Sequence, residues 1–261
     1  MHGGKPVTPI SARLAVDLEG KVAVVTGSTR GLGREMASAL ARCGADVVIS
    51  SRRADACELV AREVTRESGR KAWARACHVG HWDEIESFVD DVYDEMGTVD
   101  ILVNNAGISP LYPSLDAVDE AFFDKTFDVN LKGPFRLGAL VGTRMAAGHG
   151  GSMVHISSMA AIKPRPAYVP YAAAKAGLNA MSEGFARAFG PKVRSNVVMA
   201  GPFETDISVG WDWEAFNERA QAFCIPRAGK PVEIVGAVLY LASEAASYTT
   251  GIVLPVSGGE P

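Results

Sequence analysis

The sequence predicts an α/β fold in which one seven-stranded parallel sheet is doubly wound, with helices on both of its faces. Short runs rich in Val and Ile are continuously apolar rather than alternating, as strands buried on both faces require. Helix-length segments separate these runs, and each is long enough for the right-handed crossover that joins parallel strands. These two observations favour one doubly wound domain.

The elements follow in order along the chain. We expect strands at the apolar runs Val22 to Thr26, Asp46 to Ser50, Lys71 to Cys77, Ile101 to Asn104, Ser152 to Ile156, Ser195 to Met199 and Ile252 to Val256. Helices are expected at Leu32 to Cys43, Ala54 to Ser68, Asp83 to Met96, Asp119 to Ala147, Ala167 to Phe189 and Pro231 to Ser243. Gly133 and Pro134 interrupt the fourth helical stretch, so we expect a break or kink there.

Composition supports one globular domain. The 261 residues are 48% hydrophobic and 21% charged, and no linker-like segment divides them. We therefore expect a domain over residues 18–261, with a lid near 203–230, after a flexible arm over residues 1–17. No uninterrupted apolar run is long enough to span a membrane, and the arm has no apolar core of a signal peptide. We expect a cytoplasmic protein without a membrane partner.

Charge and cysteine content exclude other classes of protein. The chain has 26 basic and 30 acidic residues, a net charge of −4, and no basic run, so nucleic acid is not an expected partner. Its four cysteines are far apart and form neither a disulfide framework nor a zinc set: Cys43, Cys57, Cys77 and Cys224. His78, His81 and Asp83 lack a matched further ligand, so no metal is expected.

A glycine-rich loop, TGSTRGLG from Thr26 to Gly33, directly follows the first strand and opens the first helix. Glycines let the backbone approach a pyrophosphate, and a helix N-terminus offers N–H groups and positive potential. An ordinary tight turn is the alternative interpretation. The position after strand one of a parallel sheet favours a nucleotide site.

The end of the second strand bears on the choice of cofactor. Ser50, Ser51, Arg52 and Arg53 include no carboxylate, whereas an acid at Ser51 would accept hydrogen bonds from both ribose hydroxyls of NAD. Arg30 and Arg52 can instead surround a 2′-phosphate. The sequence therefore favours NADP(H) over NAD(H), the alternative being that Arg52 and Arg53 are a solvated surface pair.

Tyr171 and Lys175 are spaced i, i+4, which puts the phenol and the ammonium on one face of a helix. A proton acceptor near neutral pH needs the tyrosine pKa of about 10 lowered by ~3 units, or about 4 kcal/mol. A cation about 4 Å away at an effective dielectric of about 20 supplies about 4 kcal/mol. Ser157 and Ser158, after the fifth strand, are candidates for a hydroxyl in the crevice or for a cap.

With Asn104-Asn105-Ala106-Gly107 and Asn130, these motifs resemble the short-chain dehydrogenase/reductase superfamily in order and spacing, over Leu18 to Gly259. The resemblance implies a Rossmann-like oxidoreductase that interconverts a secondary alcohol and a ketone or aldehyde by hydride transfer with a nicotinamide cofactor. It implies Tyr171 as general acid/base, Ser158 on the substrate oxygen, Lys175 on the nicotinamide ribose, and Asn130 in a proton relay.

The resemblance also implies the residues that bind the cofactor. They are Gly27, Ser28, Thr29, Arg30, Gly31, Leu32, Gly33, Ser51, Arg52, His78, Val79, Asn104, Ala106, Gly107, Tyr171, Lys175, Gly201, Phe203 and Thr205. Val79 would meet the adenine through its backbone, and Phe203 and Thr205 would flank the nicotinamide amide. The family often has an acid or amide where His78 stands, and a neutral imidazole can accept the adenine amino proton only in the right tautomer.

The segment after Thr205 is expected to be a lid over an apolar substrate pocket. The predicted substrate contacts are Ser158, Tyr168, Trp211 and Trp213, with Tyr112 and Phe203 also on the wall of the pocket. The alternative is a short helix that packs its aromatic side chains on the body or on another subunit.

Substrate identity does not follow from these residues. By resemblance we expect a homotetramer or homodimer that acts on a small carbonyl or alcohol substrate. A cofactor-binding sensor or scaffold without turnover is the alternative function.

Overall fold

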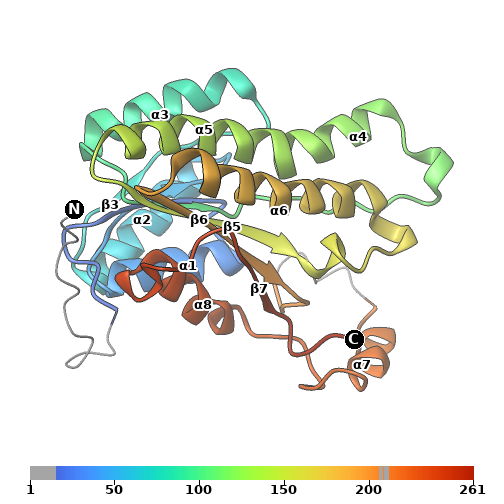
Figure 1. Cartoon of the computed structure of the whole chain (residues 1–261). Coiled ribbons are helices and arrows are strands. Elements are labelled where there is room, and N and C mark those ends of the chain that lie inside the picture. The colour runs from blue at the N-terminus through green and yellow to red at the C-terminus, as the bar shows by residue number, and fades with distance from the viewer. Residues whose placement is uncertain (1–15, 206–207, 209–211) are drawn as a thin grey trace, which may run out of the picture.

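The computed structural model describes residues 16–205, 208 and 212–261. Seven parallel strands form one sheet in the order β3-β2-β1-β4-β5-β6-β7, which confirms the predicted sheet (Figure 1). The strands are β1 Val22–Thr26, β2 Asp46–Ser50, β3 Ala72–Ala74, β4 Ile101–Asn104, β5 Gly151–Ser158, β6 Val193–Ala200 and β7 Val253–Val256.

Helices cover both faces of the sheet, as predicted. Buried side chains of α1, α2 and α8 form one core with the sheet, and those of α3, α5 and α6 form a second core on its opposite face (Figure 1). The helices are α1 Gly31–Arg42, α2 Ala54–Ser68, α3 Trp82–Met96, α4 Glu120–Phe127, α5 Gly133–Ala147, α6 Val169–Phe189, α7 Trp213–Ala220 and α8 Val235–Ala242. None of the helices in the described parts of the chain is long and apolar enough to cross a bilayer.

Four strands differ in length from the prediction, and of these β7 is only one residue shorter. Strand β3 is shorter because it lies at the edge of the sheet, although Arg75 and Cys77 still donate backbone hydrogen bonds to the chain at Ile49 and Ser51. Strands β5 and β6 are longer because they pair with each other over eight residues, including the polar residues at their ends. Apolar runs alone do not reveal such pairing.

The interruption predicted near Gly133 and Pro134 is a π-helical turn, Asp128–Lys132, just before them. Both flanking residues keep a right-handed helical backbone, so the chain passes directly from α4 through the turn into α5. A Cβ on Gly133 would lie 1.8 Å from the Val79 carbonyl oxygen. Glycine therefore lets α5 pack on the loop before α3, and the π turn carries Asn130.

From β1 the chain continues to β2 and β3 on one side of the sheet, and it then returns to β4 on the other side of β1. This reversal of strand order places a crevice at the carboxyl ends of β1 and β4. The Thr26 hydroxyl accepts hydrogen bonds from the Asn105 and Ala106 N–H groups at 3.0 and 3.1 Å. The Asn105 side chain donates to the Thr26 carbonyl at 2.8 Å. These contacts hold the glycine loop and the NNAG segment together at the rim of the crevice.

The predicted lid contains helix α7. Asp212 caps the helix by accepting a hydrogen bond from the Ala215 N–H group at 3.1 Å. Phe216 and Phe223 form a small separate core, and the Trp213 ring lies edge-on to Phe216 with centroids 5.5 Å apart. A short helix with packed aromatic side chains was the alternative to an open lid. Trp211 and residues 1–15 of the predicted arm lie outside the described residues, so the proposed division into arm and domain stays a prediction.

We predict that Gly133→Ala lowers the free energy of unfolding by at least about 2 kcal/mol, because α5 must move away from the Val79 carbonyl. Gly184→Ala is the matched control, since this exposed glycine of α6 has no atom within 4 Å of the added methyl group. The control should leave stability equal or raise it by up to about 1 kcal/mol. Urea unfolding measures both, and equal effects of the two changes would contradict the close approach.

Candidate active site

The three residues predicted to carry the chemistry come from β5 and α6. Ser158 is the last residue of β5, Tyr171 lies in the first turn of α6, and Lys175 lies one turn later. A hydrogen bond joins the side chains of Ser158 and Tyr171. The Ser157 hydroxyl is buried and donates to the Lys175 carbonyl at 3.2 Å, which leaves Ser158 as the candidate for the crevice. The Ser158 hydroxyl also accepts from the Ala160 N–H group at 3.2 Å, as the cap interpretation expected.

Lys175 is buried beneath the tyrosine. Its Nζ donates a hydrogen bond to the Ile156 carbonyl at 2.8 Å and lies 5.8 Å from the centroid of the Tyr171 ring. A Cβ on Gly107 would stand 2.9 Å from Asn130 Oδ1 and 3.5 Å from Lys175 Nζ. The NNAG segment, the π turn and α6 thus meet at Gly107, and their close approach leaves no room for a side chain at this position.

Asn130 is fully buried and fixes the loop after β4. Its Oδ1 accepts from the Ile108 N–H group at 3.2 Å, and its Nδ2 donates to the carbonyls of Ile108 and Thr126, both at 2.8 Å. These bonds give Asn130 a structural role next to Gly107 and Lys175. The predicted relay through a water molecule stays a prediction.

Burial dominates the proton affinities of the site. It raises the pKa of Tyr171, which the hydrogen bond with Ser158 lowers and the neighbouring Tyr168 raises further. Burial also lowers the pKa of Lys175 to about 8. In the chain by itself the pKa of Tyr171 is raised, and the lowering by Lys175 that the sequence suggested stays a prediction. Tyr171 is thus a protonated phenol at neutral pH and a ready proton donor.

The glycine loop has the geometry that a pyrophosphate requires. Gly27 and Gly31 have φ values of +66° and +53°, which other residues rarely adopt, and α1 begins at Gly31. A Cβ on Gly33 would lie 2.3 Å from the Gly27 carbonyl oxygen. No side chain caps the first turn of α1 at Arg30, and that turn contains no acid. A dinucleotide phosphate fits this open cradle.

Not every predicted residue of the loop faces the cradle. The Ser28 hydroxyl is buried, donates to the Val25 carbonyl at 2.7 Å and accepts from the Ser50 N–H group at 2.9 Å. Leu32 packs against the core. These two side chains hold the loop to the sheet, so only their backbone is left for a phosphate, and the predicted contact of Thr29 stays a prediction.

The structure distinguishes the two arginines after β2. Arg53 is paired with Asp55 at 2.7 Å, whereas Arg52 is exposed and close enough to His78 for its charge to lower the imidazole pKa. The Ser51 hydroxyl lies 3.3 Å from the Cys57 sulfur. Arg52 is therefore the better placed of the two for a 2′-phosphate.

His78 does not fit the role that the resemblance implied. Its Nδ1 accepts a hydrogen bond from the Gly80 N–H group at 3.2 Å, and burial together with His81 and Arg52 lowers its pKa. The ring is therefore neutral at pH 7 and carries its proton on Nε2. This tautomer makes Nε2 a donor, so it can bond to a ring nitrogen of adenine but cannot accept from the adenine amino group. The Val79 carbonyl packs on Gly133, and its adenine contact stays a prediction.

The segment after β6 approaches the glycine loop. A Cβ on Gly201 would lie 2.6 Å from Ser257, and a Cβ on Gly31 would lie 3.6 Å from the Thr205 side chain. The Phe203 ring is buried against Gly229, so it packs in the core instead of lining the pocket as predicted. Only its backbone is left for the nicotinamide.

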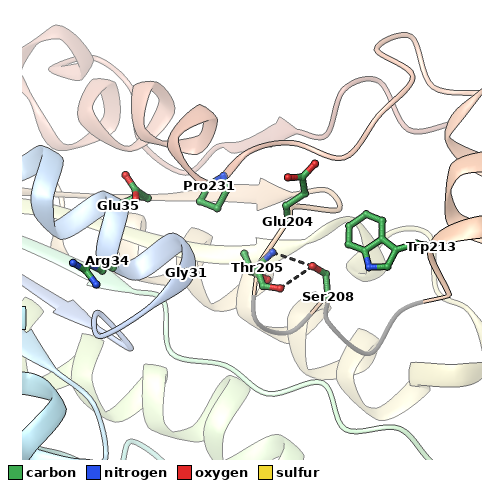
Figure 2. A pocket seen from close by; sticks show the side chains of 8 residues that line it. All are labelled: Gly31, Arg34, Glu35, Glu204, Thr205, Ser208, Trp213 and Pro231. Carbon is green, nitrogen blue, oxygen red and sulfur yellow. Dashed lines mark hydrogen bonds between the residues drawn. The ribbon is translucent and has the colours of Figure 1, made fainter.

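A cavity of about 460 Å³ lies between the N-terminus of α1 and the segment after β6 (Figure 2). Thr205 and Ser208 exchange two hydrogen bonds beside it, at 3.0 and 2.7 Å. Its lining residues are Gly31, Arg34, Glu35, Glu204, Thr205, Ser208, Trp213 and Pro231. Trp213 thus borders the loop predicted to hold the cofactor, whereas Tyr168 lies edge-on to Tyr171 with centroids 6.4 Å apart.

Two polar side chains hold the site in ways that the sequence does not reveal. The Tyr112 hydroxyl donates to the Pro166 carbonyl at 2.6 Å and accepts from the Val169 N–H group at 2.8 Å, so it fixes the start of α6. His155 is fully buried and accepts at Nδ1 from the Asn104 side chain at 3.1 Å. Asn104 therefore links β4 to β5. The sequence signal for this link is the presence of polar residues within otherwise apolar strands.

Among the residues that the structure describes, no group of three or more His, Cys, Asp or Glu side chains is arranged to hold a metal ion.

Comparison with known proteins gives consistent matches over most of the chain. A family model described as enoyl-(acyl carrier protein) reductase matches residues 27–260. Dehydrogenase/reductase SDR family member 4 of Bos taurus is 40% identical over 245 residues, which are 93% of this chain and 88% of the relative. Two solved structures superimpose with TM-scores of 0.89. One is a gluconate 5-dehydrogenase of Burkholderia cenocepacia in complex with NADP and tartrate, which is 31% identical over 94% of this chain and 96% of that one. The other is a 7α-hydroxysteroid dehydrogenase in complex with NADH and 7-oxo glycochenodeoxycholic acid, which is 35% identical over 94% of this chain and 96% of that one.

We predict that burial of Lys175 makes stability depend on pH. Between the folded pKa of about 8 and the ordinary value of 10.5, the unfolded chain binds a proton that the folded chain does not. The free energy of unfolding of the wild type, minus that of Lys175→Met, should therefore rise by about 3 kcal/mol from pH 8 to pH 10.5 and be constant below pH 8.

Urea unfolding at each pH measures this difference. Lys125→Met, which removes an exposed cation from α4, is the matched control. A wild-type minus Lys175→Met difference that stays flat over this range would contradict a buried ammonium at this position.

Proposed function

Because this chain belongs to the short-chain dehydrogenase/reductase family, we propose that it is an NADP(H)-dependent oxidoreductase that interconverts a secondary alcohol and a ketone or aldehyde. The observation that carries the proposal is the hydrogen bond between Ser158 and Tyr171, with Lys175 buried beneath them. A nucleotide fold without such a set would serve binding alone. These three groups supply proton transfer beside the nucleotide crevice.

The chain's own groups orient the substrate and move its proton. A bound nicotinamide supplies the hydride in reduction and accepts it in oxidation. The Ser158 hydroxyl holds the substrate oxygen, and Tyr171, protonated because burial raises its pKa, donates its proton to that oxygen during reduction. Lys175 and Asn130 adjoin Gly107 behind the tyrosine, where they can help return the proton. Alcohol oxidation uses the same groups in reverse.

NADP(H) is proposed over NAD(H) on the residues at the end of β2. No carboxylate follows this strand at positions 50–53, and Arg52 is exposed there without the acidic neighbour that holds Arg53. The two solved relatives were obtained with NADP and with NADH, so family membership alone leaves both cofactors open. The same chemistry with NAD(H) is the alternative.

We also propose a homodimer or homotetramer through the long helices. A groove of about 580 Å³ lies along α4, the π turn, α5 and α6. Its lining combines the apolar side chains of Phe123, Phe127, Leu131, Phe135 and Met181 with the charged ones of Asp124, Asp128 and Lys132. Phe123 and Phe135 are 43% and 44% exposed and line the same groove, and apolar side chains gathered in one exposed patch favour an interaction surface.

We predict that Tyr171→Phe lowers kcat/KM for ketone reduction by about 10²- to 10⁴-fold, because it removes the proton donor, while the NADPH dissociation constant changes less than threefold. Tyr248→Phe, at a fully exposed tyrosine, is the control and should leave both quantities unchanged. Absorbance at the nicotinamide band measures turnover over a panel of carbonyl substrates. Wild-type protein that binds NADPH but reduces none of them would favour the sensor or scaffold alternative.

We predict that Arg52→Ala weakens NADPH binding about tenfold or more and leaves NADH binding unchanged, because the charge-assisted bonds to the 2′-phosphate are lost. Arg53→Ala, whose guanidinium is held by Asp55, should change NADPH binding less than threefold. Fluorescence titration with both cofactors provides the dissociation constants. Tighter binding of NADH than of NADPH by the wild type would refute the proposed preference.

A further inference from the structure

We propose that residues 258–260, which follow β7, act as a clasp on the substrate side of the site, and that Glu260 is a positioning residue within it. The clasp ties the predicted lid, near residues 203–230, to the loop that joins Ser158 to Tyr171. It thereby sets how tightly the carbonyl substrate is held. The proposal rests on the oxidoreductase function proposed above and adds a positioning residue to the same site.

The loop over residues 159–168 connects the two hydroxyls of the site, because it begins where β5 ends and leads directly into α6. Backbone hydrogen bonds make this loop compact. The Lys163 N–H group donates to the Met159 carbonyl at 2.9 Å, and the Tyr168 N–H group donates to the Arg165 carbonyl at 3.2 Å. A contact that holds the middle of the loop therefore acts on both of its ends.

The clasp contacts the middle of this loop through two cationic side chains. Lys163 Nζ donates to the Glu260 carbonyl at 2.9 Å, and the Arg165 guanidinium lies 3.7 Å from the Glu260 carboxylate. The Glu260 side chain is 11% exposed and that of Arg165 is 43% exposed, so water screens their ion pair only in part. Arg165 accepts from the backbone of Tyr168, whose ring lies edge-on to Tyr171. Glu260 thus holds the loop next to the reacting phenol.

On its other side, the clasp is bonded to the end of the predicted lid. The Ile225 N–H group donates to the Gly258 carbonyl at 2.8 Å, and the Cys224 N–H group donates to the Gly259 carbonyl at 3.4 Å. Gly258 and Gly259 have φ values of +67° and +73°, which other residues rarely adopt. A Cβ on Gly259 would lie 2.7 Å from both the Cβ and the Sγ of Cys224. The two glycines therefore let the clasp turn and lie directly against the lid.

The clasp joins two segments that come from different parts of the fold. Helix α7 precedes Ile225, and Trp213 at its start borders the cavity of Figure 2. The glycine loop that forms the phosphate cradle lies instead at the start of α1. Loosening the clasp should therefore act mainly on substrate binding, because it moves the lid and the loop before α6 rather than the cradle.

The first test measures reduction of acetophenone, or of the best substrate in the carbonyl panel, at saturating NADPH. Glu260→Gln should raise KM about threefold or more and change kcat less than twofold, because the ion pair positions the loop and takes no part in proton transfer. Arg165→Glu should raise KM at least as much. The double variant Arg165→Glu/Glu260→Arg should return KM to within about twofold of the wild-type value, since it restores an ion pair of reversed polarity.

Glu183→Gln, which removes the carboxylate of an exposed ion pair on α6, is the matched control and should leave KM unchanged. Fluorescence titration should give NADPH dissociation constants within about threefold of the wild-type value for all of these variants.

Hydrogen exchange read by mass spectrometry tests the lid side of the clasp without turnover. Gly259→Ala strains a left-handed backbone and presses on Cys224, so the Ile225 amide should exchange at least about tenfold faster than in the wild type. Gly69→Ala is the matched control, because its φ of +70° is similar and no atom lies within 4 Å of the added methyl group. This control should leave exchange at Ile225 unchanged.

Three results would overturn the clasp and leave the oxidoreductase function intact. They are an unchanged KM in Glu260→Gln, a double variant that does not recover KM, and equal exchange at Ile225 in Gly259→Ala and Gly69→Ala. Wild-type protein that binds NADPH but reduces no carbonyl of the panel would instead refute the proposed function. Exchange at Ile225 would then still decide whether the clasp holds the lid.

Discussion

Two reciprocal hydrogen bonds between β5 and α6 are the contacts on which the site depends. Lys175 donates through its side chain to the backbone of Ile156, and the side chain of Ser157 donates to the backbone of Lys175. Each element thus supplies one side chain and one carbonyl, which fixes how α6 lies on the strand. Ser158 and Tyr171 come from the ends of these two elements, so their hydrogen bond depends on this junction. The buried ammonium is unfavourable for stability, and its hydrogen bond to Ile156 ties the first turns of α6 to β5.

Close backbone approaches complete the site from the other side. Gly107 leaves no room for a side chain between Asn130 and Lys175, and Gly133 lets α5 pack against the Val79 carbonyl. The π turn between α4 and α5 carries Asn130, whose amide spans Ile108 and Thr126. The cofactor crevice and the catalytic group therefore share one set of packing constraints, so displacement of α5 would also disturb the residues around the tyrosine.

Much of the fold could be predicted because burial on both faces leaves a local pattern. Strands β1, β2 and β4 match the predicted ranges, since each contains an uninterrupted apolar run that ends at a polar residue. The proposed catalytic residues could be predicted for a similar reason, because helical spacing puts Tyr171 and Lys175 on one face. The sequence could not show the direction of the Tyr171 pKa shift, which depends first on how completely the fold buries the phenol.

The tautomer of His78 likewise depends on the Gly80 N–H group, and the buried ring of Phe203 on Gly229 from a later segment. Contacts between distant segments therefore set the properties that local patterns left open.

The buried polar side chains of the central strands have a consequence for how the sheet assembles. Parallel strands that are apolar on both faces offer many nearly equivalent alignments, because a slip by one or two residues still buries Val against Val. His155 removes this degeneracy, since its two ring nitrogens meet Asn104 on β4 and Ser195 on β6 at 3.1 and 3.2 Å. Any slipped alignment would leave a buried polar group without its hydrogen-bond partner. The link from β4 through His155 to β6 therefore selects one alignment for β5, the strand that ends in Ser158.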